Sequence, residues 1–369
     1  MKRSNVRRAK GRRILDRERT YKWNQNQTQW QPRAIAANLN YLKSPKPGST
    51  ETRPLGIPTI RDRVVQAATR HVLEPILERQ FAEHSYGFRP NRGCKDALRR
   101  VNALLKAGFK YVVDIDLKSY FDTIPHARLI LELRKYVADN QLVALVEKFI
   151  HAEIKDGLET WTPTSGTPQG AIISPLLSNL YLNDLDHLLA KSGYEMTRYA
   201  DDLVIQCRTR EEAEQALALV AEWTTERGLT LHPTKTKIVH VDEDGFDFLG
   251  YRFIKHRRFP RKKSLQKLKD VIRDKTRRNN GSSLNTIIAD LNRTLLGWFE
   301  YFKHSWRTTF PELDSWIRGR LRSLLRRRAK RKGRGGLRES IEYPNTFFAA
   351  SGLFGLRDAH VRECQSSKR

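Results

Sequence analysis

Two stretches of sequence decide the fold of this chain: Tyr111-Val112-Val113-Asp114-Ile115-Asp116-Leu117 and Tyr199-Ala200-Asp201-Asp202-Leu203-Val204-Ile205. Side chains alternate between the two faces of a β-strand, so Asp114 and Asp116 share one face of the first stretch while apolar residues take the other. The second stretch predicts two short strands around a turn, with Asp201 and Asp202 at its tip. Acids gathered on apolar strands repel one another, and a bound cation would remove that cost.

Magnesium is the cation that this arrangement favours. Mg²⁺ binds a few carboxylate oxygens together with water and substrate phosphates. Two such ions about 4 Å apart can activate an attacking 3′-hydroxyl and stabilise a leaving pyrophosphate. The carboxylates taken singly leave a second interpretation open, in which Asp201 and Asp202 form a surface turn and Asp116 forms a salt bridge.

The net charge of the chain is +28, from 69 Lys and Arg against 41 Asp and Glu. The basic residues concentrate at the two ends: residues 1–33 hold 11 basic and 2 acidic side chains, and residues 255–336 hold 25 and 6. A charge of this size and sign favours a polyanionic partner, and nucleic acid is the first candidate. The alternative, that these cations only solvate helix faces, fits poorly because solvated faces usually mix both signs.

A membrane partner and an oxidising environment are both disfavoured. No apolar run approaches the roughly 20 residues that a spanning helix needs. The basic N-terminus lacks the apolar stretch of a signal peptide. The three cysteines lie far apart without CxxC pairs, which favours a reducing cytoplasm over a disulfide framework.

Apolar spacing predicts several helices around these strands. Residues 61–82 are expected to be helical as far as Pro75, which should begin or kink a segment because proline lacks the amide that a helix interior needs. Residues 126–155 and 176–192 are predicted to be helical. Further helices are expected from residues 265 and 284, with a loop at residues 279–283 between them.

Several motifs of this sequence resemble those of reverse transcriptases, and their residues are most similar to those of group II intron-encoded reverse transcriptase–maturases. They occur in the order typical of that family and lie at residues 53–58, 85–90, 116–122, 167–170 with 174–179, 198–202, 228–231 with 235–236, and 248–251. Residues 291–302 resemble the family's thumb, or maturase, domain, and residues 343–348 resemble the stretch near the end of its compact bacterial members.

The resemblance implies roles for individual residues. The catalytic residues are Asp116, Asp201 and Asp202, and these three would hold two Mg²⁺ ions together with the carbonyl of Leu117. The residues that would bind the incoming deoxynucleotide are Lys46, Arg53, Phe121, Gln169, Gly170 and Lys235. Phe121 matches a side chain that would collide with a ribose 2′-hydroxyl, although it could also be an ordinary core residue. The residues expected to bind nucleic acid are Arg89, Lys267, Lys269, Arg326, Arg327, Arg328, Lys330, Arg331 and Lys332.

The fold that the resemblance implies is an α+β right-hand polymerase, with fingers, a palm of antiparallel sheet backed by helices, and an α-helical thumb. The expected divisions are a basic, Gln-rich extension (1–40), fingers and palm (41–253), the thumb or maturase domain (254–315) and a basic nucleic-acid-binding segment (316–369). Trp298, Phe299, Phe302 and Trp306 are expected to pack in the thumb core and less so to stack on bases. The family's Gly-Val-Asp-Gly-like N-terminal motif has no counterpart here, and no Cys pairs or His-Asn cluster indicate its optional endonuclease.

The function implied is an RNA-directed DNA polymerase, acting on an RNA template, a DNA primer or target and dNTPs, that also binds its group II intron RNA to assist splicing and mobility. It would work in the bacterial cytoplasm, at the nucleoid when acting on DNA. Two alternatives remain open: a related enzyme recruited to phage defence or to a CRISPR array, and an RNA-binding maturase that no longer polymerises. The intact Asp116, Asp201, Asp202 and Phe121 argue against the second.

Overall fold

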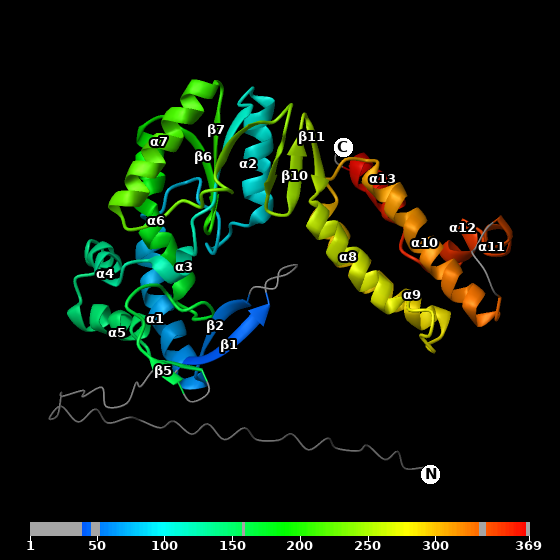
Figure 1. Ribbon diagram of the computed structural model, residues 1–369, viewed down its shortest axis with the longest axis horizontal. Helices are drawn as coiled ribbons and strands as arrows, with labels where there is room; N and C mark the ends of the chain where they lie inside the picture. The colour runs from blue at the N-terminus through cyan, green and yellow to red at the C-terminus, as the bar shows by residue number, and fades with distance from the viewer. Residues whose placement is uncertain (1–38, 46–51, 157–158, 332–336, 367–369) are drawn as a thin grey trace, which may run out of the picture. The chain divides into compact units, whose positions relative to one another are not determined.

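A computed structural model describes residues 39–45, 52–156, 159–331 and 337–366 of the chain (Figure 1). Lys46, Lys332 and the basic N-terminal stretch up to residue 38 lie outside the described residues. Within the described part, no helix is long and apolar enough to cross a bilayer.

The palm is a four-stranded antiparallel sheet in the order β6-β7-β3-β8. Its strands are β3 (Tyr111–Ile115), β6 (Glu195–Tyr199), β7 (Asp202–Cys207) and β8 (Lys237–His240). Figure 1 shows α2 (Cys94–Lys106) on one side of β6 and β7, and α6 (Ser174–Lys191) and α7 (Arg210–Glu226) on the other. Because helices cover both faces, the strands are apolar on both sides, and Val112, Val113 and Ile205 have no exposed surface.

The fingers contain a second sheet, in the order β2-β1-β4-β5, and the long helix α1 (Ile60–Glu78). The strands are β1 (Leu39–Pro45), β2 (Thr52–Pro58), β4 (Ile154–Asp156) and β5 (Glu159–Trp161). The expectation that the helix reaches only as far as Pro75 is wrong, because Pro75 lies inside α1. Leu73 and Leu77 hold the helix on the core with no exposed surface, while Pro75 and His71 face solvent. Water can therefore bond to the His71 carbonyl that lacks an amide partner.

Residues 126–155 form two helices and a strand instead of one continuous helix. The helices are α4 (His126–Arg134) and α5 (Asn140–Ile150), and β4 follows them. Asp139 starts the second helix, since its carboxylate accepts hydrogen bonds from the amides of Gln141 and Leu142. Apolar spacing alone could not separate the two helices, because the break depends on this side-chain cap. The short helix α3 (Tyr120–Thr123) lies between β3 and α4.

A small sheet, β11-β10-β9, follows the palm. Its strands are β9 (Phe246–Phe248), β10 (Tyr251–Ile254) and β11 (Arg257–Pro260). Phe246, Tyr251 and Phe253 are buried in one core with α2 and with Val112 and Val204 of the palm. The sheet crosses the expected division at residue 253, because β10 and β11 pair across it.

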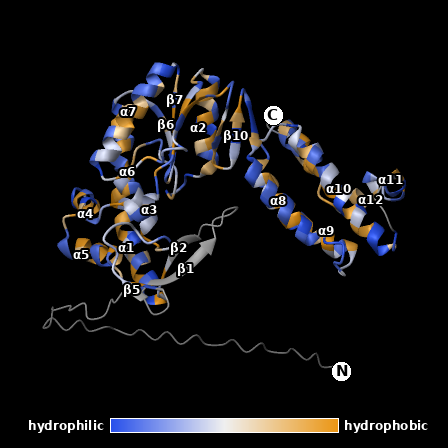
Figure 2. Ribbon diagram, in the orientation of Figure 1, coloured by the Kyte–Doolittle hydropathy of each residue, from blue (hydrophilic) through white to orange (hydrophobic). Residues whose placement is uncertain are grey.

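The thumb contains α8 (Lys262–Lys275), α9 (Leu284–Phe302), α10 (Thr309–Arg328), α11 (Leu337–Glu342), α12 (Asn345–Ala350) and α13 (Leu356–Ser366). The expected division at residue 315/316 is wrong, because α10 continues through it. One core joins Leu268 and Leu291 with Leu321, Phe348 and Leu356 from beyond that boundary. Figure 2 shows hydrophilic and hydrophobic residues alternating around α8 and α10, as expected of helices with one buried face. Phe299 is buried in the thumb core, as predicted, whereas Phe302 is buried in the core that the small sheet shares with the palm.

Candidate active site

The register of the palm strands brings two of the predicted catalytic aspartates together. Strand β3 pairs with β7 so that Ile115 stands opposite Leu203. Asp116 directly follows Ile115 and Asp202 directly precedes Leu203, so the two aspartates lie at the same end of the paired strands. Asp201 comes directly before Asp202, in the turn between β6 and β7.

The negative charge of these groups acts on a third carboxylate, that of Asp114. Burial raises the pKa of Asp114 to about 6; Lys237 opposes the rise, and the Asp202 and Asp116 carboxylates add to it. The ammonium of Lys235 lies 3.2 Å from an Asp116 oxygen. The face of the sheet that carries the predicted catalytic residues is thus a place where negative charge accumulates and cations are favoured.

No three His, Cys, Asp or Glu side chains within the described ranges are close enough together to hold a metal ion by themselves. Mg²⁺ takes one or two carboxylates and completes its shell with water and substrate phosphates. The hard oxygen donors of Asp116, Asp201 and Asp202 suit this ion.

The turn between β6 and β7 is held in a strained conformation. Ala200 has a φ of 59°, in the left-handed region, which costs a non-glycine residue about 1–2 kcal/mol. Gly87 packs directly on this turn, because a Cβ added to it would lie 2.2 Å from the Ala200 nitrogen. The carbonyl of Ala200 accepts a hydrogen bond of 2.8 Å from Arg198 Nη1. The fingers motif at residues 85–90 therefore supports the turn that carries Asp201.

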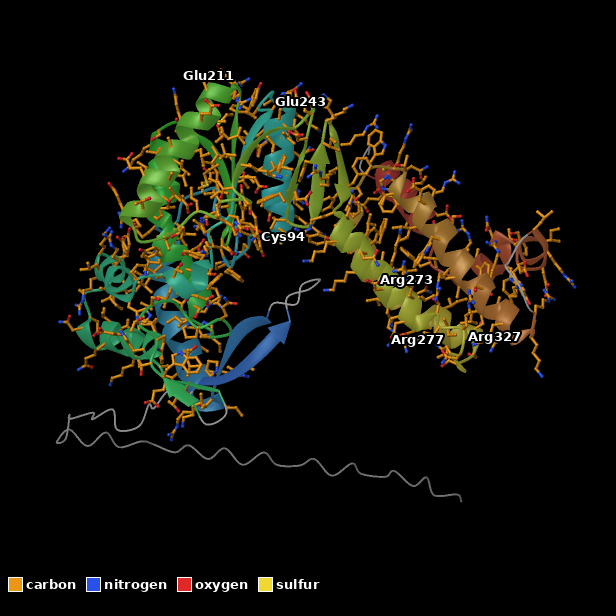
Figure 3. All side chains as sticks on the ribbon, in the orientation of Figure 1. Cys94, Glu211, Glu243, Arg273, Arg277 and Arg327 are labelled. Atoms are coloured by element: carbon orange, nitrogen blue, oxygen red, sulfur yellow. The ribbon has the colours of Figure 1, made fainter. Side chains whose placement is uncertain are left out.

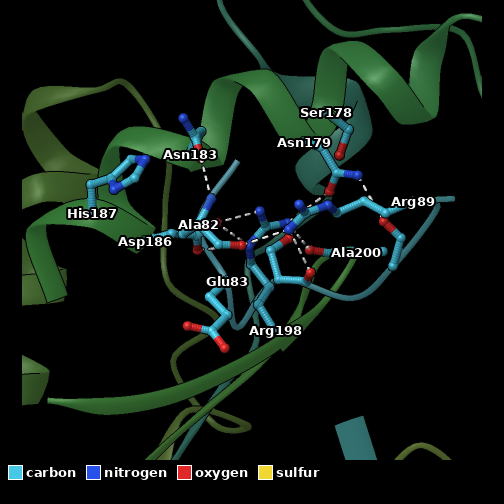
Figure 4. Close-up of polar contacts among 12 residues, drawn as sticks. Ala82, Glu83, Arg89, Ser178, Asn179, Asn183, Asp186, His187, Arg198 and Ala200 are labelled. Carbon is cyan, nitrogen blue, oxygen red and sulfur yellow. Dashed lines mark hydrogen bonds and ion pairs between the residues drawn. The ribbon is translucent and has the colours of Figure 1, made fainter. Parts of the chain in front are cut away.

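Arg198 lies at the centre of a buried polar network beneath this turn (Figure 4). Its side chain is fully buried and donates 2.8 Å from Nε to Asp186 and 2.9 Å from Nη1 to Asn179. Burial disfavours the charged guanidinium, but the Asp186 carboxylate more than offsets this and raises the pKa of Arg198. Removing one partner of such a pair typically costs about 3–5 kcal/mol, so the network fixes the turn firmly.

The predicted nucleotide-binding residues Phe121 and Gln169 line one pocket of about 380 Å³, together with Asp122 and Gly56. The Gln169 side chain donates 3.2 Å to the Asp122 carboxylate. The Gln169 carbonyl accepts a hydrogen bond from the Gly56 amide of β2, which ties the palm to the fingers sheet.

The loop that contains this glutamine is tightly packed against α3. A Cβ on Gly166 would lie 2.8 Å from the Phe121 carbonyl, and the Thr167 amide donates to that same carbonyl at 2.6 Å. Gly170 has a φ of 109°, which only glycine adopts at low cost.

Other predicted site residues are placed as follows. Arg53 lies on β2, opposite Ser44 of β1. The Leu117 side chain is buried, and its backbone forms a β-bridge to Leu231. The prediction that Arg89 binds nucleic acid is wrong. Its side chain is 3% exposed, pairs with Glu78 through Nε and Nη2, and donates from Nη1 to two backbone carbonyls, so it serves the fold of the fingers.

The predicted thumb cations differ in their exposure and in their partners. Lys267, Arg327, Arg328 and Lys330 are exposed. Lys269 lies with its ammonium 5.7 Å from the Trp316 ring, and Arg331 forms an ion pair with Glu342. The prediction for Arg326 is wrong, because this side chain is 10% exposed and lies against the equally buried Glu339. Figure 3 shows Arg327 near Arg277, and both line a pocket with Arg278 and Arg320.

Sequence reasoning missed the supporting residues. No role was assigned to Gly87, Gly166 or Asp186, or to Arg198 within its motif. One signal was present: Asn179, Asn183 and Asp186 follow helical spacing in an otherwise apolar segment, and all three are buried on α6. Polar residues on a buried helix face need partners, which here are Arg198 and the backbone of residues 80–87.

Comparison with known proteins agrees with this geometry. Residues 44–253 match the family model described as reverse transcriptase (RNA-dependent DNA polymerase), and residues 265–340 match the group II intron maturase-specific domain. Protein YkfC of Escherichia coli K12 is 35% identical over 56% of this chain and 64% of its own length. The group II intron-encoded protein LtrA of Lactococcus lactis subsp. cremoris is 37% identical over 43% of this chain and 26% of its own length.

The fold itself has counterparts among solved structures. Apo telomerase from Candida tropicalis superposes with a TM-score of 0.52 over 80% of this chain and 64% of that one, at 12% identity. At such low identity the similarity concerns the fold alone, and it agrees with the right-hand polymerase architecture expected from the sequence.

Proposed function

Because the chain belongs to the reverse transcriptase (RNA-dependent DNA polymerase) family, we propose that it copies RNA into DNA by metal-dependent nucleotidyl transfer. The register of β3 and β7 carries this proposal, since it puts Asp116 and Asp202 at the same end of the paired strands, beside the supported turn that bears Asp201. A chain without polymerase activity would have no physical need for a turn of adjacent acids that is held in place by Gly87 and Arg198.

Asp116, Asp201 and Asp202 would hold two Mg²⁺ ions, with the Leu117 carbonyl as a further oxygen donor. The contact of Lys235 with Asp116 supports this, because it shows that the carboxylate accepts a cation. When bound, the ions would supply Lewis-acid activation of the primer 3′-hydroxyl and charge stabilisation of the pyrophosphate. Lys235, Lys46 and Arg53 would bind the nucleotide triphosphate.

Phe121 would select deoxynucleotides by excluding the 2′-hydroxyl. Its place in the pocket with Gln169 and its attachment to the Gly166 loop support this role. Phe121→Ala should raise ribonucleotide incorporation relative to deoxyribonucleotide, measured as the ratio of kcat/KM values. A ratio that does not move would assign Phe121 to the core alone.

The nucleic-acid partners proposed are an RNA template, a DNA primer or target and a group II intron RNA. The maturase-specific match over residues 265–340 and the intron-encoded relative LtrA support the intron RNA. This activity would take place in the cytoplasm of a bacterium, at the nucleoid when the chain acts on DNA. A role in defence would instead be indicated if the RNA that co-purifies from the host derives from a neighbouring defence locus.

The decisive experiment removes one charge from the site. Asp201→Asn should abolish primer extension on an RNA template with Mg²⁺, because a neutral amide holds the ion poorly. Template–primer binding should survive, since phosphate contacts lie elsewhere. Asp244→Asn is the matched control, as Asp244 is exposed in the turn between β8 and β9. Appreciable extension by Asp201→Asn would refute the metal assignment.

A further inference from the structure

A small basic pocket of about 220 Å³ lies where the β10–β11 hairpin meets the connection from α9 to α10. Three arginines line it: Arg257 and Arg258 from the hairpin and Arg307 from the connection. His256, His304 and His360 complete the basic lining, with His360 contributed by α13. The pocket shares no lining residue with the pocket that contains Phe121 and Gln169.

The cations of this pocket lack acidic partners. Across the described part of the chain, none of the three guanidinium groups forms an ion pair with a carboxylate. Arg258 donates from Nε to the His304 carbonyl at 2.7 Å, so its partner is a neutral backbone group. Glu363, the acid whose charge acts on His304, is already paired with Lys303 at 3.0 Å.

The arginines are held close together by an aromatic ring. The guanidinium carbon of Arg257 lies 4.3 Å from the Trp306 ring centre, and that of Arg307 lies 5.8 Å from the same centre. The Trp306 amide donates to the Arg258 carbonyl, which fixes this ring beside the hairpin. Cation–π contacts orient the two arginines but leave their like charges uncompensated.

The electrostatic consequence is visible on the neighbouring groups. Burial, and then the charge of Arg258, lowers the pKa of His304. Burial also lowers the pKa of Arg258 itself. The shift of His304 indicates a positive local potential, and both shifts indicate a partly desolvated place, where an anion would be attracted more strongly than at an open surface.

We propose that this pocket binds one phosphate group, held by the forked guanidinium groups of Arg257, Arg258 and Arg307. Arginine forks match phosphate oxygens in geometry, and the volume suits a single phosphate better than a duplex groove. Because the lining comes from both the hairpin and the thumb connection, a bound phosphate holds these two elements to each other. The phosphate comes either from a nucleic-acid backbone or from a free nucleotide.

The first arm of the test uses inorganic phosphate with the full-length protein. Isothermal titration should give binding that weakens at least tenfold in Arg257→Gln/Arg307→Gln. Both residues are exposed. The single variant Arg307→Gln keeps the hairpin arginines, so its phosphate affinity should lie between those of the parent and the double variant. Arg362→Gln, an exposed arginine of α13 outside the pocket, is the matched control and should bind as the parent does.

The second arm distinguishes the two sources. With a single-stranded RNA oligonucleotide, the double variant should reduce the slope of log affinity against log salt by about one unit if the pocket takes a backbone phosphate. A loss of inorganic-phosphate binding with an unchanged RNA slope would assign the pocket to a free nucleotide. If the double variant matches the parent in both arms, the proposal is overturned. Primer extension and phosphate binding are also measured for Asp201→Asn. This variant should lose primer extension but keep phosphate binding, so the two proposals can fail independently.

Discussion

The palm turn, residues 198–202, and the arginine end of the thumb, residues 326–331, place their charges in different ways. In the palm turn, the backbone pairing of β3 with β7 puts Asp116 and Asp202 at the same end of the two strands, independently of their side-chain conformations. In the arginine end, adjacent residues diverge: Arg326 is buried against Glu339, whereas Arg327 is exposed. Backbone geometry therefore makes a short motif a reliable guide to function, while a run of cations is not.

The support of the palm turn offers the largest effect. Gly87→Ala puts a Cβ within 2.2 Å of the Ala200 backbone, so either the fingers motif or the turn must shift. A displacement of about 1 Å at a catalytic group can cost on the order of 100-fold in rate, and primer extension should fall by at least that much. Gly319→Ala in α10 is the control, because nothing lies within 4 Å of its added Cβ. Equal activity of the two variants would show that the turn tolerates movement.

The parts of the molecule that the sequence predicted are those set by local rules. Strand alternation predicts one face for Asp114 and Asp116, and the charge of Asp116 does raise the pKa of Asp114. The predicted turn between two apolar strands lies where Asp201 is found. Arg198 shows where this approach ends, because its role depends on Asp186 in a different element. The buried Arg89 and Arg326 were misjudged for the same reason: their partners Glu78 and Glu339 are met only in the folded chain.

The divergence within the arginine end can be tested residue by residue. Arg326→Gln should lower the free energy of unfolding by about 1–3 kcal/mol, because it removes a buried guanidinium that lies 3.1 Å from the Glu339 carboxylate. Its RNA-binding salt slope should stay as in the parent. Arg327→Gln should do the reverse, leaving stability within about 0.5 kcal/mol and reducing the slope by about one unit. Urea unfolding and binding at several salt concentrations measure both quantities, and identical behaviour of the two variants would erase the distinction.

The smallest expected effect is on the pH dependence of stability, to which the palm contributes and the arginine end does not. In the palm, His126 is 5% exposed and lies 2.7 Å from the Gly166 carbonyl and 3.1 Å from His151. Burial, helped by the charge of His151, lowers the pKa of His126 below its usual 6.5, while its hydrogen bond to Gly166 and the charge of Glu147 oppose this. Arginines keep their charge throughout this range, so the arginine end contributes no such slope.

The sign of the effect follows from the lowered pKa. The unfolded chain binds the proton more readily than the folded one, so this contribution to stability is present above about pH 6.5 and is lost as the pH falls through the folded pKa. Between pH 7 and 5.5 the parent should lose more stability than His126→Gln, whose amide can still donate to Gly166 without titrating. Urea unfolding at the two pH values measures the difference. His71→Gln, at an exposed position of α1, is the control and should keep the slope of the parent. Equal slopes for the parent and His126→Gln would mean that charging His126 costs the folded protein nothing, so that the Gly166 loop accommodates the charged imidazole.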